Sequence, residues 1–272
     1  MTRIISVPLP DGGQLNARID GPSGAPWVAF SNSVMTDLSI WDAQASVLSD
    51  RFQVLRYDQR GHGDSSLPDG PMSFDGYGAD LTALLDHCGV TRCVLIGLSM
   101  GVPTCLAAAR ARPDRVAAFV VVDGVARSAA GREAFWTERR ETAHADGMTR
   151  IAAETTARWL PDVDAGAPLA QGLIAMIAAT PVEGFAAATH ALASYDQSAA
   201  LASLTCPVLG LAGEKDGAMP DAIRTQFGPL PDVRFDTIPG AGHVPNFQCP
   251  EAFNAALAPF LDAVAQDQQE LP

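Results

Sequence analysis

The chain has 272 residues, 47% of them hydrophobic, which is enough to bury a sizeable core as one domain with an insertion. Asp and Glu total 31 against 18 Lys and Arg, and the formal net charge of -13 argues against nucleic acid or an anionic membrane as a partner. We expect neither a signal peptide nor a membrane helix, since no apolar run approaches the ~20 residues that a span requires. The five cysteines are scattered and lack metal-ligand spacing, which is typical of the reducing cytoplasm.

Strand and helix patterns alternate at both ends of the sequence. Residues 4–8 and 15–19 are predicted to form a hairpin around the turn Asp11-Gly12-Gly13. The further predicted strands are 27–30, 53–57, 93–96, 117–122, 207–212 and 233–238, and the predicted helices are 41–48, 73–88, 103–112, 221–227 and 251–265. Strands that alternate with helices indicate an α/β fold, here a mostly parallel sheet of eight strands with helices on both faces.

Between residues 131 and 201 the pattern changes to helices alone. Ala-rich helical segments such as 133–160 and 169–179 are separated by proline and glycine, and no segment favours a strand. About 70 consecutive residues exceed an ordinary connection between two strands. The sequence therefore predicts a core of residues 1–125 and 202–272, with a helical cap of residues 126–201 over the strand ends, where open α/β sheets bind ligands.

A serine in a glycine-flanked turn carries the first indication of chemistry. Ser99 lies in Gly97-Leu98-Ser99-Met100-Gly101, between an apolar strand pattern and a helical segment. This Gly-x-Ser-x-Gly pattern in its strand–turn–helix context predicts a nucleophile elbow, because the glycines permit a strained turn and close approach of neighbouring backbone. The turn would lift the Ser99 hydroxyl above the sheet edge, toward the positive end of the following helix.

A serine hydroxyl needs a general base, and the base needs a carboxylate that fixes its tautomer. His243 lies in a glycine-rich loop directly after the last predicted strand, and we expect it to be the base. Two aspartates at strand ends are candidates for the carboxylate. Asp216 is preferred, because the loop after the next-to-last strand is the commoner place for the orienting acid, and Asp123 stays the alternative.

Attack on a carbonyl creates a negative oxygen that needs donors held in place. The N–H of Met100, the residue after the nucleophile, is expected to be one donor. The other is expected in the polar loop of residues 31–36, where Ser33 N–H has the favoured offset from the preceding strand. A plain turn remains the alternative interpretation of that loop.

Several motifs extend this pattern over nearly the whole chain. They are Ser31-Asn32-Ser33 followed by Thr36-Asp37-Leu38-Ser39-Ile40-Trp41-Asp42, then Arg56-Tyr57-Asp58-Gln59-Arg60-Gly61-His62-Gly63, the elbow, and in the cap Trp136, Arg139, Gly147-Met148 and Arg158-Trp159. Together they resemble the α/β-hydrolase family, and within it the 3-oxoadipate enol-lactone hydrolases. Most α/β-hydrolases have His-Gly where this chain has Ser31-Asn32, so that replacement is the signal for the subfamily.

The resemblance implies the α/β-hydrolase fold and hydrolysis of a small carboxylated lactone or enol ester through an acyl-enzyme on Ser99, without a metal or organic cofactor. A cap arginine would bind the substrate carboxylate through paired hydrogen bonds. Arg139 is the candidate, with Trp136 as an apolar wall and with Asn32 and His190 as further substrate-binding residues. The arginines close enough in sequence to take its place are Arg127, Arg132 and Arg140.

Met35 and Val102 depart from the pattern of the enol-lactone hydrolases. Those enzymes have glycine at both positions, and the larger side chains are expected to reshape or shrink the pocket.

Other functions are compatible with the same nucleophile, base and acid. General carboxylesterases and cofactor-free perhydrolases of the haloperoxidase type use them as well, and a hydrolase scaffold can also carry a non-catalytic ligand-binding protein. The expected partner is a small-molecule ester or lactone, and the sequence leaves a homo-oligomer open.

Overall fold

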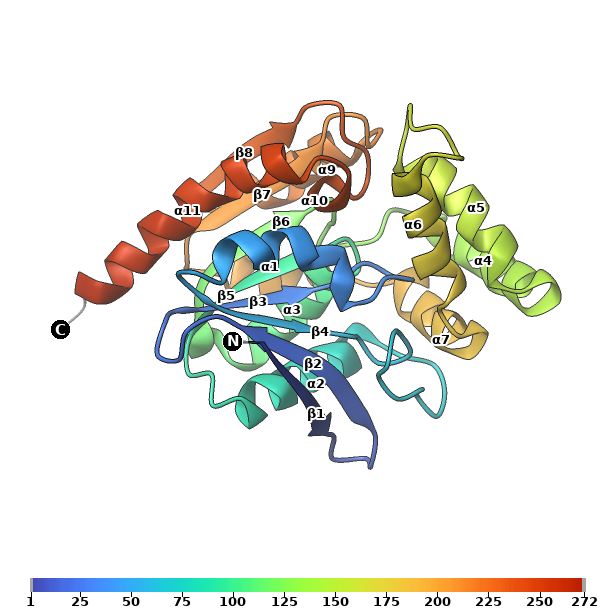
Figure 1. Cartoon of the computed structure of the whole chain (residues 1–272). Coiled ribbons are helices and arrows are strands. Elements are labelled where there is room, and N and C mark those ends of the chain that lie inside the picture. The colour runs from blue at the N-terminus through green and yellow to red at the C-terminus, as the bar shows by residue number, and fades with distance from the viewer. Residues whose placement is uncertain (1, 271–272) are drawn as a thin grey trace.

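An eight-stranded sheet forms the centre of the molecule (Figure 1). The computed structural model describes residues 2–270. The strands are β1 (Arg3–Pro8), β2 (Gln14–Asp20), β3 (Trp27–Ser31), β4 (Gln53–Tyr57), β5 (Cys93–Leu98), β6 (Val116–Val122), β7 (Val208–Gly213) and β8 (Val233–Ile238). They lie in the order β1-β2-β4-β3-β5-β6-β7-β8, antiparallel from β1 to β4 and parallel beyond. The predicted sheet, with its N-terminal hairpin, is confirmed.

Helices cover both faces of the sheet, because alternate residues of an inner strand point to opposite sides. On β5, Val94 and Ile96 belong to the apolar cluster of α1 (Asp42–Leu48) and α11 (Pro250–Glu270), while Cys93 and Leu95 belong to the cluster on the other face. The helices of that other face are α2 (Phe74–His87), α3 (Gly101–Ala111), α8 (Ser198–Ala202) and α9 (Met219–Phe227). The short helices are η1 (Leu38–Trp41), η2 (Pro113–Arg115) and α10 (Pro245–Gln248).

Four helices between β6 and β7 lie to one side of the sheet, at the right of Figure 1. They are α4 (Arg132–Asp146), α5 (Met148–Trp159), α6 (Pro168–Ala178) and α7 (Val182–Ala193), and α4 packs against α7 while α5 packs against α6. The helical segment predicted across α4 and α5 is divided at Gly147, whose φ of 76° is left-handed and ends the first helix. The boundaries of the cap, residues 126 and 201, stay a prediction.

The two chain segments that join these helices to the core run side by side. The Gln197 N–H donates to the Ala126 carbonyl at 2.8 Å, and the Ser128 N–H donates to the Tyr195 carbonyl at 3.1 Å. The side-chain carbonyl oxygen of Gln226, on α9, accepts from the Ala126 N–H at 2.9 Å. The outgoing and returning segments are therefore held to each other and to the core.

Among the described residues, no single helix is both long enough and apolar enough to cross a membrane. Only α6 and α7 taken together, bent by 91° at the break between them, reach that length and composition. Leu173 and Ile177 of α6 and Phe185 of α7 are fully buried in the apolar cluster that the helical insertion shares with the sheet.

A contact between two glycine backbones docks α7 on the core. Gly61 lies in the loop after β4 with a left-handed φ of 83°, and Gly184 lies in the first turn of α7. A Cβ atom built on Gly184 would stand 1.9 Å from the Gly61 carbonyl oxygen. Neither backbone has room for a side chain at this point, so the glycine-rich loop after β4 sets the position of α7.

We expect Gly184→Ala to lower the free energy of unfolding by about 1–3 kcal/mol, because the added methyl group forces α7 away from the loop. Gly172→Ala in α6 is the matched control. Its Cβ would stand 3.9 Å from Phe247 Cζ, and alanine favours a helix interior, so its stability is expected to be unchanged or raised. Urea unfolding midpoints measure both variants, and equal stability would contradict the close contact.

Candidate active site

Ser99 sits in the sharp turn between β5 and α3, with a left-handed φ of 53°. The glycines around it are required by space. A Cβ on Gly97 would lie 2.5 Å from the Gly101 carbonyl oxygen, and one on Gly101 would lie 2.2 Å from the Ser31 carbonyl oxygen. A non-glycine residue keeps such a backbone only where its surroundings over-determine it. The turn therefore has the strained geometry that the Gly-x-Ser-x-Gly pattern predicts.

His243 joins Ser99 to Asp216 through two hydrogen bonds. Its Nε2 lies 2.9 Å from Ser99 Oγ, and its Nδ1 lies 2.7 Å from Asp216 Oδ2. Because a carboxylate only accepts, Nδ1 carries the proton and Nε2 is left to accept from the Ser99 hydroxyl. The structure thus brings together the residues predicted as nucleophile, base and acid, from the segments that follow β5, β8 and β7.

Segments of the core and of the helical insertion hold His243 in place. The Lys215 N–H donates to the Ala241 carbonyl at 2.8 Å, which ties the loop of Asp216 to that of His243. The His243 N–H donates to the Trp159 carbonyl at 3.0 Å, and the two rings lie 4.9 Å apart between centroids. Because Trp159 ends α5, the insertion takes part in orienting the histidine.

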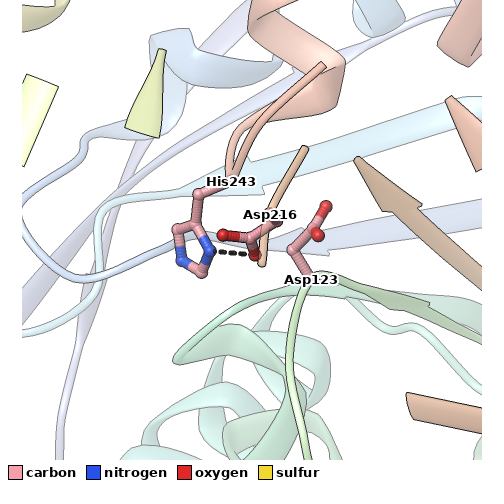
Figure 2. Close-up of side chains that lie close together, drawn as sticks. All are labelled: Asp123, Asp216 and His243. Carbon is pink, nitrogen blue, oxygen red and sulfur yellow. Dashed lines mark hydrogen bonds and ion pairs between the residues drawn. The ribbon is translucent and has the colours of Figure 1, made fainter. Parts of the chain in front are cut away.

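Asp123, the alternative acid, lies beside Asp216 without a hydrogen bond to His243, as Figure 2 shows. Both of its carboxyl oxygens lie 3.1 Å from the Gly213 N–H. Complete burial and then the negative charge of Asp216 raise the pKa of Asp123 well above its ordinary range.

The same three side chains offer ligand atoms within 4.8 Å of one another, close enough to hold a cation. Binding a cation there would break the hydrogen bond between Asp216 and Nδ1 of His243. The hydrogen-bonded arrangement that the structure contains, continued from Nε2 to Ser99, is suited to proton transfer.

The two backbone N–H groups predicted to bind the negative oxygen have no hydrogen-bond partner among the described residues. Neither the Ser33 N–H nor the Met100 N–H makes a hydrogen bond within residues 2–270, although both residues are buried. Unpaired buried N–H groups are rare, because each costs roughly 1–3 kcal/mol. The Ser33 hydroxyl is likewise buried without a partner among the described residues.

A cavity of about 1120 Å³ opens over Ser99 and His243, between the strand ends and the helical insertion. Its apolar wall includes Val34, Trp136, Trp159, Leu192, Tyr195 and Met219. Of the residues expected to bind substrate, Trp136 of α4 thus lies in the wall of this cavity.

Arg139, His190 and Asn32 are placed elsewhere. The Arg139 guanidinium points to α5, where it donates to the Thr155 hydroxyl and the Ile151 carbonyl. His190 lies exposed on α7, outside the cavity wall. The Asn32 amide donates to the Tyr57 carbonyl at 2.8 Å and accepts from the Trp41 indole at 3.0 Å. Its hydrogen-bonding capacity is used to fix the loop from the interior.

Met35 and Val102 do not narrow the cavity. Both side chains are fully buried in the apolar clusters on the two faces of the sheet. Met35 has a left-handed φ of 62°, a backbone conformation that glycine adopts more readily than a residue with a side chain. The expectation that these two side chains restrict the pocket is corrected accordingly, since neither belongs to its wall.

Arg132 and Arg158 line the cavity where Arg139 was expected to. Their Cζ atoms lie 4.2 and 5.4 Å from the centroid of the Phe135 ring. Neither forms an ion pair or a hydrogen bond with a described side chain. Burial lowers the pKa of Arg132, and burial together with the positive charge of Arg132 lowers the pKa of Arg158. An anion between them would relieve both effects.

Neither arginine is the candidate that the sequence pattern favours for binding a carboxylate. Arg132 was one of several alternatives, and Arg158 had no role although it precedes the conspicuous Trp159 in the cap motif. The signal that could have found Arg158 is this neighbour, since a tryptophan at a helix end next to an arginine pairs an apolar wall with a cation.

Comparison with known proteins agrees with the fold. The chain matches the alpha/beta hydrolase family over residues 22–256. It is 33% identical to 3-oxoadipate enol-lactonase 2 of Acinetobacter baylyi over 89% of this chain and 91% of that protein. The enol-lactonase from Burkholderia xenovorans has a TM-score of 0.88 and 30% identity, covering 96% of this chain and 100% of that chain. A thermophilic esterase from Thermogutta terrifontis, with malate bound, has a TM-score of 0.89 and 29% identity, covering 97% and 99%.

We expect Asp216→Asn to lower kcat for ester hydrolysis by about 10⁴-fold, because the amide holds His243 in the wrong tautomer. Asp123→Asn is the matched control. Asp123 makes no hydrogen bond to His243 among the described residues and the amide oxygen still accepts from the Gly213 N–H, so kcat is expected to change little. Steady-state kinetics of both variants measure this ranking, and the reverse ranking would assign the acid to Asp123.

Proposed function

Because the chain belongs to the alpha/beta hydrolase family, we propose that it hydrolyses a small carboxylated lactone or enol ester through an acyl-enzyme on Ser99. The observation that carries the proposal is the hydrogen-bonded series Ser99–His243–Asp216 in the wall of a cavity that also contains Arg132 and Arg158. The enol-lactonases among its relatives support this class of substrate.

In the first half of the reaction, Ser99 Oγ attacks the ester carbonyl carbon while its proton passes to His243 Nε2. Asp216 accepts a hydrogen bond from the Nδ1–H of His243 and stabilises the imidazolium that forms. The tetrahedral intermediate then collapses, the bond to the leaving oxygen breaks, and His243 gives its proton to that oxygen. In a lactone the leaving oxygen stays attached to the acyl group, so ring opening releases no fragment before water attacks.

The N–H groups of Ser33 and Met100 are proposed to bind the negative oxygen of this intermediate. Each donor of this kind stabilises the transition state by roughly 3 kcal/mol. Both are without a partner within the described residues, so a substrate oxygen satisfies them without breaking an existing bond. In the second half, a water molecule loses its proton to His243, attacks the acyl carbon and restores Ser99.

Arg132 and Arg158 are proposed to bind the substrate carboxylate, in the role first assigned to Arg139. Both guanidiniums line the cavity and stand against Phe135, so they need little reorganisation to form charge-assisted hydrogen bonds. Trp136, four residues beyond Arg132 on α4, supplies apolar surface to the carbon skeleton.

A general carboxylesterase is the second candidate, and the size of the cavity favours it. At about 1120 Å³ the cavity is slightly larger than the roughly 300–1,000 Å³ typical of ligand pockets. That volume accommodates esters much larger than a single lactone ring. The thermophilic esterase among the structural relatives is in line with this reading.

We expect fast hydrolysis of 3-oxoadipate enol-lactone and slow hydrolysis of a neutral short-chain ester. The loss of ultraviolet absorbance of the lactone measures its hydrolysis. Ser99→Ala is expected to abolish both, because it removes the nucleophile. Turnover of the neutral ester alone would assign the general carboxylesterase. Turnover that survives in Ser99→Ala would contradict the acyl-enzyme.

We expect Arg132→Ala and Arg158→Ala each to raise KM for an anionic ester by about tenfold, equivalent to about 1.4 kcal/mol of lost binding. A neutral ester of the same size is expected to keep its KM. Arg139→Ala is the matched control, because its guanidinium faces Thr155 instead of the cavity. If both esters lose affinity equally in the Arg132 and Arg158 variants, these residues do not bind a carboxylate.

A further inference from the structure

Gln59, in the loop after β4, lies buried at the centre of a polar network beside the site. Its Nε2 donates to the Asn32 carbonyl oxygen at 2.8 Å. Its Oε1 accepts from the Thr104 hydroxyl at 3.1 Å and lies 3.5 Å from Ser31 Oγ. Because the Asn32 carbonyl can only accept, the amide nitrogen faces it, and this settles the orientation of the Gln59 side chain.

The Asn32 carbonyl belongs to the same planar peptide unit as the Ser33 N–H. In a trans peptide these two groups point in opposite directions, so a bond that fixes one also fixes the direction of the other. Gln59 holds the carbonyl end, while the Asn32 side chain is fixed between Tyr57 and Trp41. The Ser33 N–H, which has no partner within residues 2–270, is thereby held in one direction.

Thr104 links the same glutamine to Met100, the residue that carries the second free N–H. Its hydroxyl lies 3.1 Å from Gln59 Oε1 and 3.0 Å from the Met100 carbonyl oxygen, at the start of α3. The start of α3 also packs directly on the loop after β3, where a Cβ on Gly101 would lie 3.1 Å from the Asn32 carbonyl oxygen. Gln59 therefore connects the loop that carries one free N–H to the helix start that carries the other.

We propose that Gln59 is a positioning residue that fixes the distance and direction of the Ser33 and Met100 N–H groups, the two oxyanion donors of the function proposed above, on which this inference rests. A negative oxygen exists only after attack on the carbonyl has begun. Loss of the glutamine amide therefore weakens binding of the transition state and leaves binding of the substrate unchanged.

The test uses Gln59→Met, which keeps the length of the side chain and removes both of its hydrogen bonds. For the ester that the wild type hydrolyses fastest, we expect kcat to fall about 10- to 100-fold, less than the loss of a whole oxyanion donor, with KM nearly unchanged. Phenylboronic acid forms a tetrahedral adduct on a reactive serine. Its affinity is expected to fall by the same factor as kcat.

Gln53→Met is the matched control. Gln53 is also buried on β4, and its amide donates to the Ala25 carbonyl at 3.0 Å, at the end of the strand remote from Ser99. This variant is expected to lose stability while keeping kcat and boronate affinity.

Thr104→Val removes only the link to α3. It replaces Gln59→Met as the test if that variant does not fold. We again expect kcat and boronate affinity to fall in parallel.

Folded variants of Gln59 or Thr104 that keep the wild-type kcat and boronate affinity would overturn the positioning role and leave Ser99-dependent hydrolysis standing. A change in KM alone would overturn it too, because the donors would then act on bound substrate. A wild type without Ser99-dependent hydrolysis would overturn the proposed function, and this inference with it.

Discussion

The left-handed backbone at Ser99 is the constraint on which the rest of the site depends. The turn holds only because Gly97 and Gly101 let three backbone segments approach more closely than a Cβ atom allows. The same close approach sets the start of α3, which carries the Met100 N–H, against the loop after β3, which carries the Ser33 N–H. One strained turn thus fixes the nucleophile and the donors that the proposed reaction needs.

The helical insertion contacts the proposed base as well as forming part of the cavity wall. The end of α5 supplies the Trp159 carbonyl and ring that hold His243, so the base of the core depends on a contact from the insertion. The adjacent Arg158 and the first residue of α4, Arg132, bring positive charge to the cavity of a protein whose formal net charge is -13. Because the net charge of the whole chain is negative, this positive charge is a local feature of the cavity.

The sheet, the elbow and the residues that meet there could be predicted because each has a local determinant. Apolar runs mark the strands, glycines mark the elbow, and chain order with strand ends selects Ser99, Asp216 and His243. Side-chain direction on the cap helices has no such determinant. Arg132 and Arg139 are seven residues apart and so share a face of α4, yet α5 crosses at Arg139 and offers it Thr155. Sequence spacing cannot distinguish the two.

The roles of Asn32 and Gln59 needed the structure for a related reason. A polar residue in a motif near a nucleophile can face the substrate or hold the backbone that does, and only its hydrogen-bond partners decide between the two. Both amides bond to backbone carbonyls of neighbouring segments, which lie 25 and 27 positions away in the chain. The division of the helical segment at Gly147 is similar, because glycine inside a helical pattern is compatible with an uninterrupted helix.

The central claim is that His243 activates Ser99 for attack, and labelling with a fluorophosphonate tests it most directly. The account predicts a single stoichiometric adduct on Ser99, located by peptide mass spectrometry and absent from Ser99→Ala. It also predicts labelling at least about 100-fold slower in folded His243→Ala, because the hydroxyl then lacks its base. An adduct on another residue, or equal labelling rates with and without His243, would contradict it.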